Sequence, residues 1–126
     1  MKIETTKAPK AIGPYSQAIS AGDFIFVSGC CPFNSENGET VGDTIETQTT
    51  QAMNNLRAVV EASGLKMLNI VKTTCFISDM KNFPDFNKIY AEYFLSGDFP
   101  ARSCVEVSRL PKDVLIEVEA ILWNKE

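Results

Sequence analysis

The chain has 126 residues, of which 44% are hydrophobic and 22% charged, so it can bury a core and is too apolar to remain disordered. Its 12 basic and 16 acidic residues give a net charge of −4 with no run of Lys or Arg, which disfavours nucleic acid as a partner. Histidine is absent, which excludes Ser-His-Asp and Cys-His catalysis and zinc sites built on imidazole. We expect a single domain spanning residues 1–126.

The cysteines and the N-terminal segment bear on the compartment. The 4 cysteines, at positions 30, 31, 75 and 104, form no Cys-x-x-Cys motif, so reduced thiols are expected. No apolar signal region and no run of about 18 apolar residues occurs. We therefore expect a cytoplasmic protein that does not contact membranes, with an organellar location left open.

The first elements in chain order are a predicted β-hairpin and a loop. Residues 18–20 and 24–28 are rich in β-forming side chains and flank a short turn at 21–23. Residues 32–42 contain Pro, Asn, Ser and Gly with few apolar side chains, which is typical of a loop.

Two amphipathic helices follow. Asp43, with Glu46 three residues later, resembles a capping box, and the apolar residues after it share one helical face until Gly64. Asn82 is a candidate N-cap for a second helix, in which aromatic and aliphatic residues recur at helical spacing over 83–94, with Gly97 as its expected end.

Three further strands are predicted at 70–78, 102–108 and 114–123 from their β-branched and aromatic content. The resulting order, β-β-α-β-α-β-β, indicates an α+β domain. Two helices can cover only one face of such a sheet, so its second face must meet water or a partner subunit.

Alternation of side chains sets an expected register for the last two strands. If these strands pair with each other, Val105 opposite Ile116 and Val107 opposite Val114 bring the apolar residues onto one face. The second face then carries charged and large apolar side chains together: Arg102, Cys104, Glu106, Leu115, Glu117, Glu119, Ile121 and Trp123. Because a contiguous apolar patch is uncommon on monomers, this face predicts a homo-oligomer with Arg102 near its interface.

Arg102 is the candidate for chemistry on that face, because a guanidinium grips a carboxylate with two parallel hydrogen bonds. In the expected register Glu119 lies opposite Arg102 and would close a structural salt bridge. Glu117 is a diagonal neighbour and would leave room for a small acid. Spacing alone favours a structural ion pair between Arg102 and Glu119. The register alone does not decide which of the two glutamates would act with Arg102.

Long sequence blocks spread over nearly the whole chain carry a resemblance to a known family. The longest is Phe-Pro-Ala-Arg-Ser-Cys-Val-Glu-Val at 99–107, which continues through 109–113 to Ile-Glu-Val-Glu-Ala at 116–120. Shorter matching blocks lie at 12–18, 27–29, 62–65, 71–74 and 86–87. On these blocks the chain resembles the Rid (YjgF) family, in its RidA branch of imine deaminases.

The resemblance implies a chorismate-mutase-like α+β fold, with a mixed sheet and two helices on one face, assembled as a homotrimer with active sites at the subunit clefts. The implied activity is hydrolysis of 2-imino acids or their enamine tautomers, such as 2-iminobutanoate and 2-iminopropanoate, to 2-keto acids and ammonia. These compounds are reactive products of pyridoxal-phosphate-dependent dehydratases. No cofactor or metal is expected.

The resemblance also assigns roles to individual residues. Arg102 would hold the substrate carboxylate, and Glu117, rather than Glu119, would activate water at the imine carbon. Cys104 would shape the pocket, and the remaining cleft residues would be Tyr15, Ser28, Gly29 and Asn87. The family usually has Gln at the position of Cys30, so the pocket rim differs here.

Several alternatives stay open. Cys104 could be read as a nucleophile, but no neighbouring group that would lower its pKa is evident, so a packing role is preferred. The same Arg102 could serve a non-catalytic module that binds 2-keto acids. A ribonuclease or translation inhibitor is a third reading, disfavoured by the acidic balance.

Overall fold

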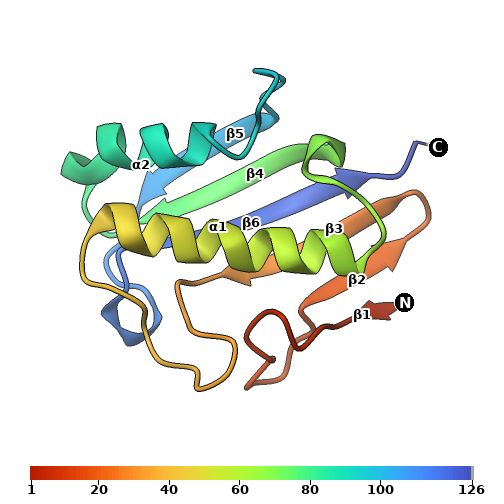
Figure 1. The fold of residues 1–126 in the computed structure, drawn as a ribbon, viewed down its shortest axis with the longest axis horizontal. Coiled ribbons are helices and arrows are strands. Elements are labelled where there is room, and N and C mark those ends of the chain that lie inside the picture. The colour runs from red at the N-terminus through yellow and green to blue at the C-terminus, as the bar shows by residue number, and fades with distance from the viewer. Residues whose placement is uncertain (126) are drawn as a thin grey trace.

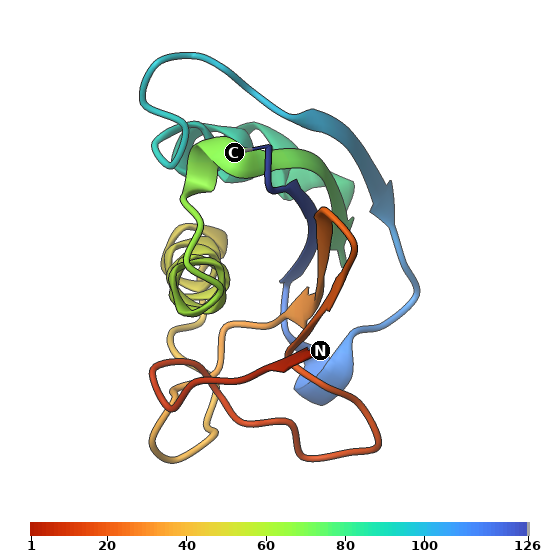
Figure 2. The ribbon, with the colours of Figure 1, turned by 90° about the vertical axis from the view of Figure 1, so that its right-hand side faces the viewer.

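Six strands form one mixed sheet, and two α-helices cover one of its faces (Figure 1). The structure is a computed structural model that describes residues 1–125. Its strands are β1 (Lys2–Ile3), β2 (Ala18–Ala21), β3 (Phe24–Cys30), β4 (Ile70–Ile77), β5 (Ala101–Glu106) and β6 (Ile116–Trp123). Its helices are α1 (Ile45–Ala62) and α2 (Phe83–Ala91), with 3₁₀ turns at Met67–Asn69, Met80–Asn82 and Pro111–Asp113. The edge-on view in Figure 2 shows both helices on the same side of the sheet, which confirms the predicted α+β architecture.

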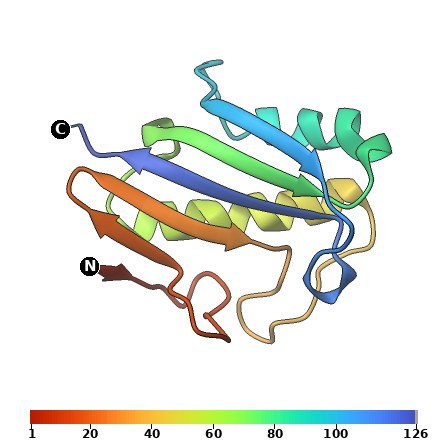
Figure 3. The ribbon, with the colours of Figure 1, turned by 180° about the vertical axis from the view of Figure 1, so that it is seen from behind.

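The strand order is β1-β2-β3-β6-β4-β5. The predicted hairpin is present as β2 and β3, with Ala21 opposite Phe24. All neighbours are antiparallel except β4 and β5, which run parallel because α2 connects them as a crossover. Seen from behind in Figure 3, β4 lies between β5 and β6 along their full length.

The expected pairing of the last two strands is therefore wrong. Ile77 of β4 is opposite both Glu106 of β5 and Ile116 of β6, so β4 separates the two strands. Alternation constrains which face a residue occupies but not which strand lies beside it. The crossover through α2 places β5 on β4, and residues 107–115 then carry the chain past the end of β4 to reach the position of β6.

This topology also reverses the predicted face of Arg102, Cys104 and Glu106. Arg102 pairs with Thr73, whose buried hydroxyl contacts Tyr90 of α2, so Arg102 lies on the helix-covered face. Glu117 is opposite Phe76 and alternates with the buried Ile116 and Val118, so it occupies the other face.

The helix termini differ from the expected positions by a few residues. Thr44, not Asp43, is the N-cap of α1, and its hydroxyl accepts from the backbone N–H of Thr47 at 3.2 Å while the Thr47 hydroxyl accepts from Thr44 N–H at 3.3 Å. Two hydroxyls thus form the capping box. Asn82 occupies the N-cap position of α2 without a side-chain cap bond.

The second helix ends at Ala91, well before Gly97, where the sequence predicted its end. The next backbone N–H groups bond three residues back, from Tyr93 to Tyr90 and from Phe94 to Ala91, so the chain tightens into turns. The apolar spacing continues through these turns because Phe94 still packs against the core. Periodicity therefore overestimated the helix length.

The core lies between the sheet and the two helices. Its largest fully buried side chains include Met53, Leu56, Phe86, Ile77, Ile116 and Leu122. The opposite side of the sheet, which we call the open face, exposes the large apolar side chains Ile19, Phe24, Phe26, Val105 and Trp123. Within residues 1–125, no helix has the length and apolarity needed to cross a bilayer.

Leu56→Ala should lower the free energy of unfolding by about 2–5 kcal/mol, because the Leu56 side chain is fully buried on α1 and its removal leaves a cavity. Leu95→Ala is the matched control: Leu95 is 94% exposed, so this variant should stay within about 0.5 kcal/mol of wild type. Urea denaturation followed by circular dichroism measures both. Equal losses in the two variants would contradict the assigned core.

Candidate functional site

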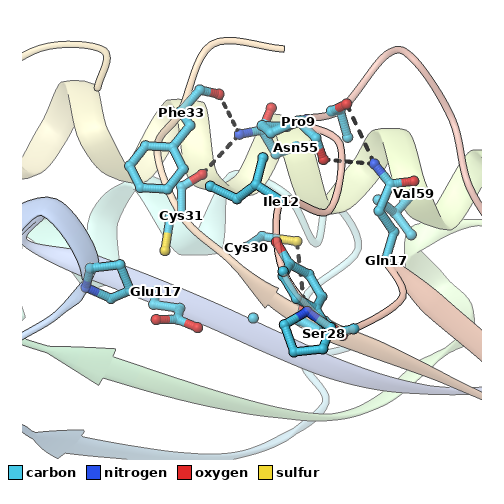
Figure 4. A pocket seen from close by; sticks show the side chains of 16 residues that line it. Pro9, Ile12, Gln17, Ser28, Cys30, Cys31, Phe33, Asn55, Val59 and Glu117 are labelled. Atoms are coloured by element: carbon cyan, nitrogen blue, oxygen red, sulfur yellow. Dashed lines mark hydrogen bonds between the residues drawn. The ribbon is translucent and has the colours of Figure 1, made fainter. Parts of the chain in front are cut away.

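A pocket of about 490 Å³ opens where β3 ends, between the N-terminal loop, the start of the 31–42 loop and α1 (Figure 4). Four of the residues expected from the sequence line it: Tyr15, Ser28, Gly29 and Glu117. Cys30 and Cys31 also contribute, and the apolar wall includes Ile12, Phe33, Val59 and Pro111. The pocket therefore combines one carboxylate with a largely apolar lining, which is the usual composition of a small-molecule site.

The carboxylate of Glu117 lies against the bare backbone of Gly29. A Cβ atom at Gly29 would overlap the Glu117 carboxyl group, so only glycine permits this approach. The pairing of β3 with β6 shifts register between Val27 and Cys30, and this irregularity sits beside the contact. Local backbone geometry thus brings the Glu117 carboxylate to the pocket mouth.

Burial raises the pKa of the Glu117 carboxyl above its ordinary value, and the negative charge of Glu119 raises it further. A hydrogen bond with the Cys31 thiol opposes this rise, because it favours the ionised carboxylate. A carboxylate with an elevated pKa accepts a proton more readily than an exposed one, which suits a general base.

The two adjacent thiols are poor nucleophiles. Burial and the nearby charge of Glu117 raise the pKa of Cys30 to about 12, and the same causes raise the pKa of Cys31. The Cys30 thiol contacts the Ser28 carbonyl at 3.5 Å. Because the thiolate is the reactive form, these cysteines shape the pocket rather than react in it.

Two buried amides hold the pocket walls, and the sequence did not indicate either role. Gln17 bonds in both directions with Thr5 and donates to the Pro9 carbonyl at 2.7 Å, which fastens the N-terminal loop. Asn55 on α1 donates to the carbonyls of Cys31 and Phe33, both at 2.9 Å, as the dashed lines in Figure 4 show. Both side chains are buried, with Gln17 7% and Asn55 3% exposed, and this burial together with their hydrogen bonds identifies them as supports of the pocket wall.

Tyr15 and Ser28 complete the pocket rim. The Ser28 hydroxyl donates to the Ser16 carbonyl at 2.6 Å, so it fixes the loop that carries Tyr15. Tyr15 follows a tight turn closed by its N–H to the Gly13 carbonyl, and its side chain is about half exposed. The ring is therefore available to a ligand or a neighbouring subunit.

The other expected residues, Arg102, Cys104 and Asn87, lie on β5 and α2, outside this pocket. Burial raises the pKa of the Cys104 thiol and Arg102 only partly offsets this, which agrees with a packing role. The Asn87 Oδ1 atom is buried and has no hydrogen-bond partner within residues 1–125.

The salt bridge considered between Arg102 and Glu119 is absent, and that expectation is wrong. Within residues 1–125 the ion pairs are Lys2–Glu4 and Arg109–Asp113. Glu119 is opposite Thr74 on the open face, whereas Arg102 is opposite Thr73 on the helix-covered face. The Arg102 guanidinium therefore has no carboxylate partner in its own described chain.

Arg102 and Glu117 of one chain are too far apart to share a small substrate. Their partners on β4, Thr73 and Phe76, are three residues apart, which is about 10 Å along the strand. One strand lies between β5 and β6, which adds roughly 10 Å across the sheet. Their side chains also leave opposite faces.

Comparison with known proteins identifies the class of protein. The family model described as Endoribonuclease L-PSP, which is the YjgF/Rid family, matches residues 5–123. The chain belongs to this family.

Individual relatives are similar over nearly their whole length. A RutC family protein of Pyrococcus horikoshii is 50% identical over 98% of this chain and 97% of its own. The 2-iminobutanoate/2-iminopropanoate deaminase of Escherichia coli is 50% identical over 94% of each chain. Among solved structures, E. coli TdcF with bound serine superposes with a TM-score of 0.92 at 42% identity, covering 98% of both chains. Yeast Mmf1 superposes with a TM-score of 0.94 at 38% identity, covering 99% of this chain and 98% of its own.

Cys31→Ala should raise the pKa of Glu117, because it removes a hydrogen bond that favours the ionised carboxylate. A ¹³C NMR titration of the Glu117 carboxyl carbon measures the shift. Cys30→Ala is the control, since the Cys30 thiol contacts the Ser28 carbonyl instead. A Glu117 pKa that is unchanged or lower in Cys31→Ala would contradict the assigned contact.

Proposed function

We propose that this protein is a hydrolytic deaminase of 2-imino acids and their enamine tautomers, with 2-iminobutanoate and 2-iminopropanoate as representative substrates. The observation that carries the proposal is the Glu117 carboxylate, which lines the pocket against Gly29 and whose pKa is raised above its ordinary value. The 50% identity to a relative named 2-iminobutanoate/2-iminopropanoate deaminase supports the same activity. By removing reactive intermediates, the reaction would protect other enzymes.

The proposed mechanism needs one carboxylate and positioned water. Glu117 accepts a proton from water while the water oxygen bonds to the C=N carbon, and Glu117 then gives that proton to the imine nitrogen. In the tetrahedral intermediate the hydroxyl proton passes through Glu117 to the amine, the C–N bond breaks and the C=O bond forms, so ammonia leaves and a 2-keto acid remains. Since the imine carbon is already electrophilic, positioning and one general base supply enough stabilisation of the transition state.

Substrate binding is assigned to the remaining expected residues. Arg102 would hold the substrate carboxylate through its N–H donors, which no carboxylate of its own described chain occupies. Cys104 and Asn87 would lie beside Arg102, and the buried, unpartnered Asn87 Oδ1 would accept a hydrogen bond in the complete site. Tyr15, Ser28 and Gly29 would line the Glu117 side of the cleft.

We infer that the sites form at clefts between the subunits of a homotrimer. The separation of Arg102 from Glu117 in one chain supports this arrangement, because a second copy must then bring its Arg102 to the Glu117 pocket. The open face supports it as well, since Phe24, Phe26 and Trp123 are each more than 40% exposed there. Sedimentation of a stable monomer at micromolar concentration would exclude the assembly.

Addition of the protein to a dehydratase reaction should reduce the fraction of imine captured by semicarbazide. Arg102→Ala and Glu117→Gln should each lower this effect by about 100-fold or more, because they remove the carboxylate anchor and the base. Tyr93→Phe is the control and should keep wild-type activity, because Tyr93 belongs neither to the Glu117 pocket nor to the residues around Arg102. If wild type and Glu117→Gln both leave the trapped fraction unchanged, a module that binds 2-keto acids without catalysis becomes the better interpretation. Undiminished activity of Glu117→Gln alone would contradict the role of Glu117 as the base.

The two inactive variants should complement each other in mixed trimers. If each site joins Glu117 of one chain to Arg102 of the next, random assembly of equal amounts restores both wild-type residues in about one quarter of the sites. Co-refolding of Arg102→Ala with Glu117→Gln, followed by the trapping assay, measures this fraction. Without complementation, both residues would have to act within one chain.

A ribonuclease activity is the second candidate, favoured by the family description Endoribonuclease L-PSP. The net charge of −4 and the apolar lining of the pocket oppose it, because RNA binding relies on a basic surface. Cleavage of RNA that survives rigorous purification and is lost in Arg102→Ala would revive it.

A further inference from the structure

The Arg102 guanidinium packs against aromatic rings of α2 rather than against acids. Its central carbon lies 4.8 Å from the centre of the Tyr90 ring, 5.3 Å from Phe83 and 5.7 Å from Phe86. These three residues recur at i, i+3 and i+7 on α2, so they form one stripe that faces β5. We call Phe83, Phe86 and Tyr90 the aromatic cradle.

The cradle is tied to the strand register that places Arg102. Thr73, directly opposite Arg102 on β4, is fully buried, and its hydroxyl lies 2.7 Å from the Tyr90 hydroxyl. Phe86 and Tyr90 are buried and their rings pack 5.4 Å apart. The same strand that fixes the Arg102 backbone thus fixes the ring beneath its guanidinium.

The three arginines of the chain are held in different ways. Arg109 makes a bidentate pair with Asp113, and Arg57 lies over Tyr93 while donating to the Asn54 side chain at 3.0 Å. Within residues 1–125, Arg102 alone among them makes no side-chain hydrogen bond. Its position is therefore maintained without use of its donors.

A guanidinium has two separate means of interaction. Its flat faces attract the π-electrons of aromatic rings, and its N–H donors point outward in the plane. An ion pair would position Arg102 but would also compete with an incoming carboxylate. Contact through the faces alone leaves the in-plane donors for a ligand.

We propose that Phe83 and Tyr90 are positioning residues that hold Arg102 by its faces and keep its N–H donors free for the substrate carboxylate. This inference rests on the proposed function of Arg102 as the carboxylate anchor. Phe83 is the member suited to substitution, because it is only partly buried, whereas Phe86 and Tyr90 belong to the core.

The first test compares Phe83→Leu with Phe83→Tyr in the intact, assembled protein, with 2-ketobutyrate as the probe. Phe83→Leu keeps an apolar side chain but removes the ring, so the Kd from calorimetry and the KM for imine hydrolysis should both rise about three- to tenfold, with kcat within about twofold of wild type. Phe83→Tyr keeps the ring and should bind like wild type.

Tyr93→Leu is the matched control, since it removes the ring beside Arg57, which lies outside the proposed site. Its Kd for 2-ketobutyrate should equal that of wild type. Equal binding by wild type and Phe83→Leu would overturn the proposal, and so would equal weakening in Phe83→Leu and Phe83→Tyr, because the ring would then be irrelevant.

A second measurement observes Arg102 without any ligand. In ¹H–¹⁵N spectra of the arginine side chains, the Arg102 Nε–H signal should show an upfield ring-current shift that diminishes in Phe83→Leu and persists in Phe83→Tyr. An unshifted wild-type signal would overturn the proposal. If the shift and the binding of 2-ketobutyrate behave as expected but no imine is hydrolysed, the positioning role holds and the deaminase proposal fails.

Discussion

The insertion of β4 between β5 and β6 decides which residues of this protein can act together. It places Arg102 against the helices and Glu117 on the opposite side of the sheet, with a strand between them. Adjacent strands would have placed Glu119 opposite Arg102 and Glu117 diagonal to it, and the inserted strand separates both glutamates from the arginine. Each charged group is left without an opposite charge in its own described chain.

The two charged groups are accommodated by different physical means. Glu117 loses solvation beside Gly29, and the resulting rise of its pKa is moderated by the Cys31 thiol. Arg102 is held by the rings of Phe83 and Tyr90, which attract a guanidinium without using its hydrogen-bond donors. The first arrangement tunes proton affinity and the second preserves hydrogen-bond donors, which are the properties that a base and a carboxylate anchor require.

The walls of the pocket rely on two buried amide side chains. Gln17 and Asn55 bind backbone carbonyls on two separate loops, so irregular segments gain fixed positions without forming strands. A buried amide with several hydrogen bonds is costly to disrupt, because its loss leaves carbonyl groups unsatisfied. The pocket is therefore shaped by the same interactions that stabilise the loops around it.

Local sequence patterns determined the elements of this protein, and its tertiary contacts decided how they are combined. The β2–β3 hairpin, both helices and the later strands follow from turn residues, helical periodicity and β-branched runs, which act over a few residues. The resemblance carried by residues 99–120 indicates Arg102 and Glu117 from the sequence alone. The position of β4, the helix-covered face of Arg102 and the supporting amides Gln17 and Asn55 could not be read from the chain. Alternation specifies a face but no neighbour, and the value of a buried polar group depends on partners far away in sequence, so only the assembled structure settles them.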